Sequence, residues 1–314
     1  MKKLKFILPV LALFSAIITS CGNDDDTTDP NFIPARDRAE ELIASTAEVE
    51  GYLETHFYNY EEFASPPADF DFRIKFDTIA GDNSNKIPLM SQVDFKMVKD
   101  RVDSDVEYKL YFLKVIEGEG DRPSFPDIAR ITYEGTYVSD EDDSIKNKLF
   151  DSSVSPLRFD MTQIVNGLQD ALIEFKAATS FSTNPDGTVA YEGYGVGAVF
   201  MQSGLGYYVN PPPTTTGGVP IPVYSQLIFS FQLLETEVGD QDNDGIPSVM
   251  EDINENGLEE DDNTDGDTLP NYADADDDGD GRPTEDEIII NEDGSITFPD
   301  TDGDGTPDHL DADS

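Results

Sequence analysis

The sequence predicts an α+β fold in which an antiparallel sheet wraps around one short helix. Two observations lead to this fold: several segments between residues 106 and 238 have strand-like patterns, and only one short segment among them has a helical pattern. A third observation concerns the remainder, because residues 240–314 hold 28 Asp and Glu against a single Arg. One helix against an antiparallel sheet is an α+β arrangement, and the acidic tail is predicted to be a separate part.

The first residues have the pattern of a secretion signal. Lys2, Lys3 and Lys5 precede an apolar run over residues 6–19. A transmembrane helix needs about 20 apolar residues, whereas this run is shorter and contains Pro9. We therefore predict a signal peptide over residues 1–20.

The end of this segment resembles the lipobox of bacterial lipoproteins. Ile18 stands where leucine is usual, and Ser20 precedes Cys21, which is the only cysteine of the chain. A single cysteine has no intramolecular disulfide partner, and acylation explains its position after the apolar run. The resemblance implies a lipid anchor on Cys21 that holds the protein in the cell envelope. We expect the membrane to be the outer one, at its periplasmic or its surface face.

The charge of the chain restricts its partners. The formal net charge is -46 at pH 7, so a nucleic-acid partner is excluded and cations are expected instead. Residues 21–34 contain Asp24, Asp25, Asp26 and Pro30 and are predicted to be a solvated acidic tether. An acidic run beside a lipidated cysteine also resembles the surface-export signals of some lipoproteins.

Residues 35–105 are predicted to form an N-terminal extension. An amphipathic pattern over residues 35–58 predicts a helix, and alternation over 70–79 and 93–98 predicts two strands. His56 has no second metal ligand at a useful spacing, so we interpret it as a partly buried structural residue.

Longer strands are predicted from residue 106 onward. Their ranges are 106–116, 127–138, 157–160, 195–201 and 226–235. The helix among them follows Asn166, a candidate N-cap, and has apolar residues at the i, i+3, i+4, i+7 spacing that buries one face. These residues are Leu168, Ala171, Leu172 and Phe175.

Six sequence blocks within this region resemble the FKBP family of peptidyl-prolyl cis-trans isomerases. In chain order they are IARITYEGTYV, LFDSS, SPLRFDM, QIVNGLQDAL, SGLGYYV and GVPIPVYSQLIFSFQLLE. Each block is short, and the resemblance depends on their order. It covers residues 106–237, within a domain that we place at 106–238.

The resemblance implies an apolar pocket for a proline ring and an isomerase activity that needs no cofactor. Proline-containing polypeptides would be its clients. Carried over block by block, the pocket residues are Tyr133, Phe150, Asp151, Ile164, Val165, Leu168, Tyr207, Ile221 and Phe229, with Leu157 in the wall. Tyr133 is expected to donate a hydrogen bond to Asp151. The Val165 N–H and the Tyr207 hydroxyl are expected to bind substrate carbonyls.

The sequence departs from the family at the pocket floor. The family often has Trp there, whereas this chain has Leu168 and contains no Trp. Residues 177–195, with a turn at 184–187, and residues 211–218 are longer than in minimal members. A catalytically silent module that only binds proline-containing segments is therefore the alternative function.

The tail, residues 239–314, contains three stretches with the D-x-D-x-D-G-x5-E/D spacing of a calcium-binding loop. Their candidate ligands are Asp240, Asp242, Asp244 and Glu251; Asp276, Asp278, Asp280 and Glu287; and Asp300, Asp302, Asp304 and Asp311. Prolines interrupt the flanks, so paired EF-hand helices are not expected. The tail resembles thrombospondin type 3 repeats, which implies structural calcium. A disordered acidic linker and a calcium-dependent adhesion or spacer protein remain the alternatives.

Overall fold

The computed structural model describes residues 35–141, 144–214 and 218–314. The predicted signal peptide, Cys21 and the tether lie outside the described residues. None of the helices in the described ranges combines the length and the apolar character needed to cross a bilayer.

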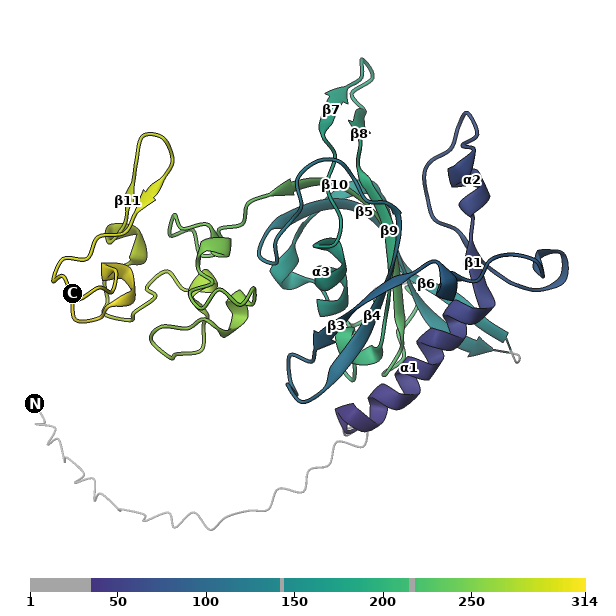
Figure 1. The fold of residues 1–314 in the computed structure, drawn as a ribbon, viewed down its shortest axis with the longest axis horizontal. Coiled ribbons are helices and arrows are strands. Elements are labelled where there is room, and N and C mark those ends of the chain that lie inside the picture. Colours follow the sequence, from purple (N-terminus) through teal and green to yellow (C-terminus); the bar gives the residue numbers. More distant parts are fainter. Residues whose placement is uncertain (1–34, 142–143, 215–217) are drawn as a thin grey trace, which may run out of the picture. The chain divides into compact units, whose positions relative to one another are not determined.

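The main domain is built on a six-stranded sheet in which every neighbouring pair is antiparallel (Figure 1). The strand order is β3-β4-β9-β10-β5-β6. The strands span Asp94–Lys99 (β3), Glu107–Ile116 (β4), Ile128–Glu141 (β5), Ser144–Asp160 (β6), Gly195–Met201 (β9) and Leu227–Glu237 (β10). With the short helix α3 (Asn166–Leu172) beside it, this sheet confirms the predicted α+β fold.

Two helices cover the two faces of the sheet. On β10, Phe229 and Phe231 pack in the core that contains α3, whereas Ile228 packs in a second core together with Tyr52 and Leu53 of α1. This division follows from the strand geometry, in which successive side chains point to opposite faces. Helix α1 spans Arg38–Thr55, and the Asp37 side chain caps it by accepting a hydrogen bond from the Glu40 N–H at 2.9 Å.

The predicted extension is part of the same sheet. Its second predicted strand is β3, which pairs along β4 from Asp94 opposite Phe112 to Lys99 opposite Glu107. The first predicted strand is much shorter than expected: only Phe76–Thr78 (β2) is extended, and it pairs with His56–Tyr58 (β1). Residues 35–105 therefore supply an edge strand and a helix that covers one face. The other α-helix of this segment is α2, at Tyr60–Ala64, and two 3-10 turns follow at Gly81–Asn83 and Leu89–Ser91.

Two further predictions were wrong in detail, and one hairpin was not predicted. Strand β6 begins at Ser144 rather than residue 157, so it includes the LFDSS block. Val165 is the N-cap of α3, and Asn166 is its first residue. The insertion at 177–195 contains an unpredicted hairpin of β7 (Ser180–Thr183) and β8 (Val189–Glu192). Its predicted turn is confirmed, since the Gly187 N–H donates to the Asn184 carbonyl at 2.9 Å.

The tail has a local structure that repeats. At four places a backbone N–H donates to the carbonyl nine residues earlier, and a proline precedes each donor. The donors and acceptors are Ser248 and Gly239, Asn271 and Asp262, Thr284 and Ala275, and Asp308 and Pro299. Each donor starts a 3-10 turn and is buried, with an exposed fraction of 4% or less. The tail also contains the two-residue strands β11 (Ile289–Ile290) and β12 (Ile296–Thr297).

Candidate functional site

A cavity of about 430 Å³ lies where α3 begins, between strands β5, β6 and β10. Eight of the nine predicted pocket residues line it: Tyr133, Phe150, Asp151, Ile164, Val165, Leu168, Tyr207 and Phe229. The ninth, Ile221, lines a smaller adjoining cavity that shares Phe150, Asp151 and Tyr207. Strands and a helix that are distant in sequence thus bring the predicted residues together.

Aromatic rings form the wall of the cavity. The Phe229 ring is 4% exposed and packs edge-on against Phe150, with the ring centroids 5.6 Å apart. Tyr133 packs in the same way against Phe159, at 5.5 Å. Leu168, 5% exposed, forms part of the apolar surface from the first turn of α3. These side chains can exclude water from a small apolar group such as a proline ring.

Tyr133 and Asp151 form the polar contact expected between them. The Tyr133 hydroxyl donates to Asp151 Oδ2 at 2.6 Å, across neighbouring strands β5 and β6. Burial of the phenol, and next the hydrogen bond to the negative Asp151, raise the pKa of Tyr133. The tyrosine therefore stays protonated, and the carboxylate fixes the direction of its hydroxyl.

Two further donors belong to residues that line the cavity. Burial, followed by the negative charge of Asp151, raises the pKa of the Tyr207 hydroxyl, which keeps its proton. At the start of α3, no described residue accepts a hydrogen bond from the Val165 N–H. An N–H in the first turn of a helix has no partner within the helix and is available to a ligand carbonyl.

The segment that carries Tyr207 is fixed from both sides. The Tyr208 N–H donates to the Ser203 carbonyl at 3.1 Å, and the Tyr208 hydroxyl donates to the Arg36 carbonyl at 2.7 Å. Tyr208 has a φ of 50°, a conformation that non-glycine residues rarely adopt. The residues before α1 thus help to hold the tyrosine that faces the cavity.

The prediction for Leu157 was wrong, and five lining residues were missed. Leu157 is 41% exposed and is not among the lining residues, whereas Phe159 is. The β5–β6 pairing shifts register just before Leu157. Ser153 lies opposite Tyr133 and Leu157 opposite Ile131, so β6 has more residues between these two pairs than β5 has. The missed residues are Ile131, Arg158, Phe159, Asp160 and Gln163. Phe159 could have been found from the SPLRFDM block, because its side chain lies on the same strand face as that of Leu157.

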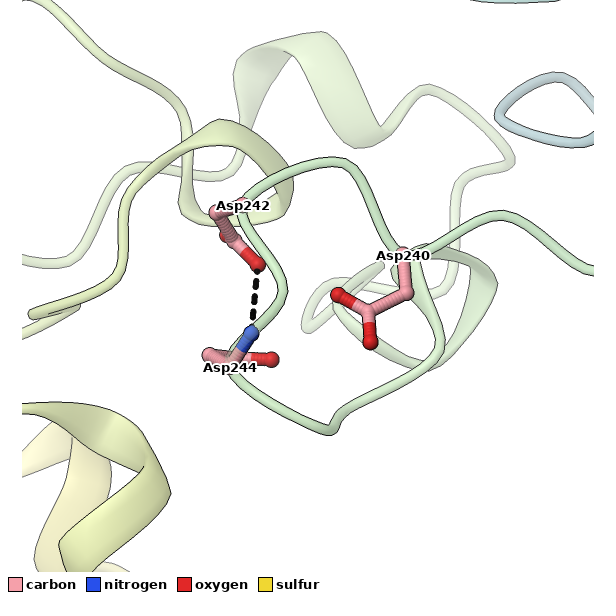
Figure 2. A group of neighbouring side chains, drawn as sticks. All are labelled: Asp240, Asp242 and Asp244. Carbon is pink, nitrogen blue, oxygen red and sulfur yellow. Dashed lines mark hydrogen bonds between the residues drawn. The ribbon is translucent and has the colours of Figure 1, made fainter.

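The acidic loops of the tail bring carboxylates together. Figure 2 shows the first loop, in which Asp240, Asp242 and Asp244 offer oxygens within 4.8 Å of one another. The Asp244 N–H donates to Asp242 Oδ1 at 3.2 Å, so a hydrogen bond within the loop joins its backbone to one of its own side chains. The same grouping occurs at Asp276, Asp278 and Asp280, at Asp300, Asp302 and Asp304, and at Asp265, Asp267 and Asp274.

The carboxylates predicted at the last ligand position of each loop, Glu251, Glu287 and Asp311, have different surroundings. Glu251 lies in a compact group with Asp244 and Asp277. Glu287 instead pairs with Arg282, at 3.3 Å between Nη1 and Oε1. Among the described residues, neither Glu287 nor Asp311 belongs to a group of this kind.

The group around Glu251 is electrostatically unfavourable as it stands. Burial, and next the charges of Asp242, Asp244 and Asp277, raise the pKa of Glu251 to about 10. Burial, followed by the charge of Asp244, raises the pKa of Asp277 to about 8. At an effective dielectric constant near 20, two negative charges within 4.8 Å repel by roughly 3 kcal/mol. The arrangement fits an all-oxygen cation site, the kind of donor set that calcium prefers.

Comparisons with known proteins find one family model and several similar solved structures. The family model described as BamM C-terminal matches residues 241–299. No curated protein matches the chain. Similar solved structures include a peptidyl-prolyl cis-trans isomerase from Pseudomonas syringae pv. tomato, at 15% identity and a TM-score of 0.34, over 65% of this chain and 98% of that one.

Two other similar structures are FkpA from Escherichia coli and FKBP73 from wheat. FkpA from Escherichia coli has 19% identity and a TM-score of 0.33, over 63% of this chain and 62% of its own. The three FKBP domains of wheat FKBP73 have 15% identity and a TM-score of 0.31, over 46% of this chain and 51% of their own. The chain is thus similar, at low identity, to these solved structures, and its residues 241–299 match the BamM C-terminal family.

Proposed function

We propose that the protein is a peptidyl-prolyl cis-trans isomerase that acts on X-Pro bonds of polypeptides in the bacterial cell envelope. The observation that supports this function best is the aromatic cavity in which Tyr133, bonded to Asp151, lies beside Tyr207 and the Val165 N–H. An apolar cavity with a few directed donors suits a proline ring flanked by peptide carbonyls.

The reaction needs only differential binding. The barrier to rotation about a peptide bond is about 18 to 20 kcal/mol, because resonance gives the C–N bond double-bond character. The polar resonance form is strongest when the amide is planar and well solvated. A dry aromatic wall disfavours that form, and donors that hold the neighbouring carbonyls favour the twisted amide. No nucleophile and no cofactor take part in this step.

The proposed location follows from the N-terminal segment. An acyl chain on Cys21 would hold the protein at a membrane, and the acidic tether would let the domain reach exported polypeptides. Outer-membrane attachment, at the periplasmic or surface face, is part of the proposal. Recovery of a Cys21→Ser variant in the membrane fraction with its signal peptide removed would contradict the anchor.

Catalysis is tested by measuring cis-trans exchange of an X-Pro peptide with the full chain and with Tyr207→Phe. We expect the wild type to accelerate exchange and the variant to be slower by roughly tenfold, since one hydrogen bond worth about 1.4 kcal/mol in the transition state is lost. Tyr191→Phe is the matched control. Its hydroxyl bonds Glu235 at 2.6 Å, and Tyr191 is not among the residues that line the cavity.

The test separates the isomerase from the silent binding module, which are two of the functions that the sequence left open. A wild type that binds the proline peptide without accelerating exchange would replace the isomerase with the silent binding module. A Tyr207→Phe variant as fast as the control would leave the isomerase standing and remove the assigned role of this hydroxyl.

A further inference from the structure

Three carboxylates from different parts of the tail meet in the protein interior. Asp244 and Glu251 belong to the first acidic loop, and Asp277 follows the first ligand position of the second loop. Their oxygens lie within 4.8 Å of one another, and the residues are only 3%, 3% and 2% exposed. The sequence spacing did not single out Asp277, because it falls between the alternating positions of its own loop.

The carboxylate oxygens in this group lack partners. Both oxygens of Glu251, both of Asp277 and Oδ2 of Asp244 are buried and have no hydrogen-bond partner among the described residues. Arg282 is the only Arg or Lys of residues 240–314, and it pairs with Glu287. Buried acidic oxygens are normally paired or bound to a metal ion.

The backbone directs these side chains toward one another. The Ile246 N–H donates to Asp244 Oδ1 at 2.7 Å, which leaves Oδ2 for another contact. The Asp277 N–H donates to Thr284 Oγ1 at 3.2 Å, within the repeated turn that ends the second loop. A hydrogen bond to Oδ1 thus holds the Asp244 carboxylate, and a backbone hydrogen bond holds Asp277 in place, while the unpartnered oxygens take part in neither.

We propose that Asp244, Glu251 and Asp277 hold one calcium ion that joins the first acidic loop to the second. Asp244 is shared with the neighbouring Asp240 and Asp242, so further carboxylate oxygens lie beside the ion. Calcium accepts six to eight oxygen ligands in flexible geometry, which suits carboxylates from several loops. Zinc prefers nitrogen and sulfur ligands, and none belongs to this group.

This site differs from three independent loops in what it does to the chain. A loop that binds an ion with its own residues orders only itself, whereas a ligand from another loop fixes the distance between two segments. Asp277 is separated from Glu251 by a region with little apolar core, so the ion would replace side-chain packing as the link between them. The inference is independent of the isomerase proposal.

Titration calorimetry with calcium chloride tests the site in the full chain after chelation. Asp277→Asn keeps the shape of the side chain and removes one charge. We expect the variant to bind one ion fewer than the wild type, or to bind it at least roughly tenfold more weakly, since even residues behind the ligands typically contribute that much. Glu292→Gln is the control, because Glu292 is an exposed tail carboxylate outside the group.

Thermal unfolding provides a second signature that a general packing defect would not produce. In chelator, Glu251→Gln should unfold at a higher temperature than the wild type, because a neutral amide replaces a buried carboxyl that has no hydrogen-bond partner and lies among other carboxyls. In calcium it should unfold at a lower temperature, because a ligand is missing. Glu292→Gln should follow the wild type in both conditions.

Either of two results would overturn the site. One is a wild type that binds no calcium at millimolar concentration. The other is an Asp277→Asn variant that binds the same number of ions as the wild type with the same affinities.

Discussion

At the scale of single residues, the contact between Tyr133 and Asp151 has a role that can be separated from charge. Asp151 is exposed, so water can replace its hydrogen bond, and its loss should cost little stability. Its effect lies in the direction of the Tyr133 hydroxyl. We predict that Asp151→Ala slows proline isomerisation by roughly tenfold, whereas Asp151→Asn, which keeps an acceptor, retains most of the rate. Exchange kinetics of the two variants decide this, and equal losses in both would show that the charge matters instead.

Gly135 lets the rings of Phe150 and Phe229, which line the cavity, pack closely against β5. A Cβ atom there would lie 2.7 Å from Phe150 Cζ and 2.9 Å from Phe229 Cε1, so both rings would have to move. We predict that Gly135→Ala costs about 1 to 3 kcal/mol of unfolding free energy through overpacking. It should also lower kcat/KM, because the displaced rings narrow the space for proline. Urea unfolding and exchange kinetics measure the two effects, and unchanged values in both would mean that the wall is loosely packed.

The six FKBP-like sequence blocks predicted most of the pocket residues, because each block corresponds to a strand, helix or loop beside the cavity. They failed at Leu157 and Phe159, which share a strand face. Both pair with β5 in the same unbroken register, Leu157 opposite Ile131 and Phe159 opposite Ala129, so alternation along the strand does not tell them apart.

At the scale of elements, α1 is attached to the sheet by a buried polar network. Arg38 of α1 forms an ion pair with Asp100, which follows β3, and the Tyr108 hydroxyl of β4 donates to Asp100 at 2.7 Å. Burial tends to raise the pKa of Asp100, but hydrogen bonds from Tyr108, from the Val102 and Asp103 N–H groups and from Arg38 outweigh it, and the pKa is lowered.

This network makes stability depend on pH in a defined direction. Because the folded-state pKa of Asp100 lies below its unfolded value of about 3.9, its contribution is present above that pH and is lost as the pH falls through the folded-state pKa. We predict that Asp100→Asn is destabilised by roughly 2 to 4 kcal/mol at pH 7 and loses less stability than the wild type on acidification. Urea unfolding at several pH values tests this, with exposed Asp105→Asn as the control, and parallel pH profiles would contradict it.

Long elements were predictable and short pairings were not. The helix over 35–58 and the strands at 106–116, 195–201 and 226–235 were found within a few residues, since each has a sustained apolar pattern. The pair β1–β2 and the hairpin β7–β8 hold three or four residues per strand, too few to show a period. The membership of β3 in the main sheet is a long-range pairing, which local sequence does not specify.

At the scale of the whole molecule, two kinds of stabilisation divide the chain. Both apolar cores lie between Val49 and Leu233, whereas the tail has few buried apolar residues and many buried carboxylates. The spacing of Asp and Gly revealed the acidic loops, and Gly245, Gly281 and Gly305 have the positive φ values that such turns require. It could not reveal Asp277, whose neighbours come from another loop.

The tail also contacts the main domain directly. Gln241 Nε2 donates to the Pro126 carbonyl at 2.6 Å and, at 3.3 Å, to Oδ1 of Asp160, which lines the cavity. Asp160 does not depend on this contact, because its Oδ1 also accepts from the Thr162 N–H at 2.9 Å and from the Thr162 hydroxyl at 2.7 Å. The rim of the cavity is therefore held from within the main domain.

A chain shortened at residue 238 should consequently remain folded and active. Removal of the tail deletes the Gln241 contacts, the packing of Tyr272 on Phe125 at 6.0 Å and the ion pair of Glu260 with Arg101 at 2.8 Å, all of which lie outside the two cores. We predict a loss of about 1 kcal/mol, which lowers Tm by roughly 2 to 4 °C for a domain of this size. The isomerisation rate should stay within about twofold of the full chain, a difference below about 0.5 kcal/mol. Exchange kinetics and thermal unfolding of the two chains provide the comparison. A shortened chain that folds but has lost catalysis would show that the acidic tail takes part in binding the polypeptide client, since every residue assigned to the cavity would still be present.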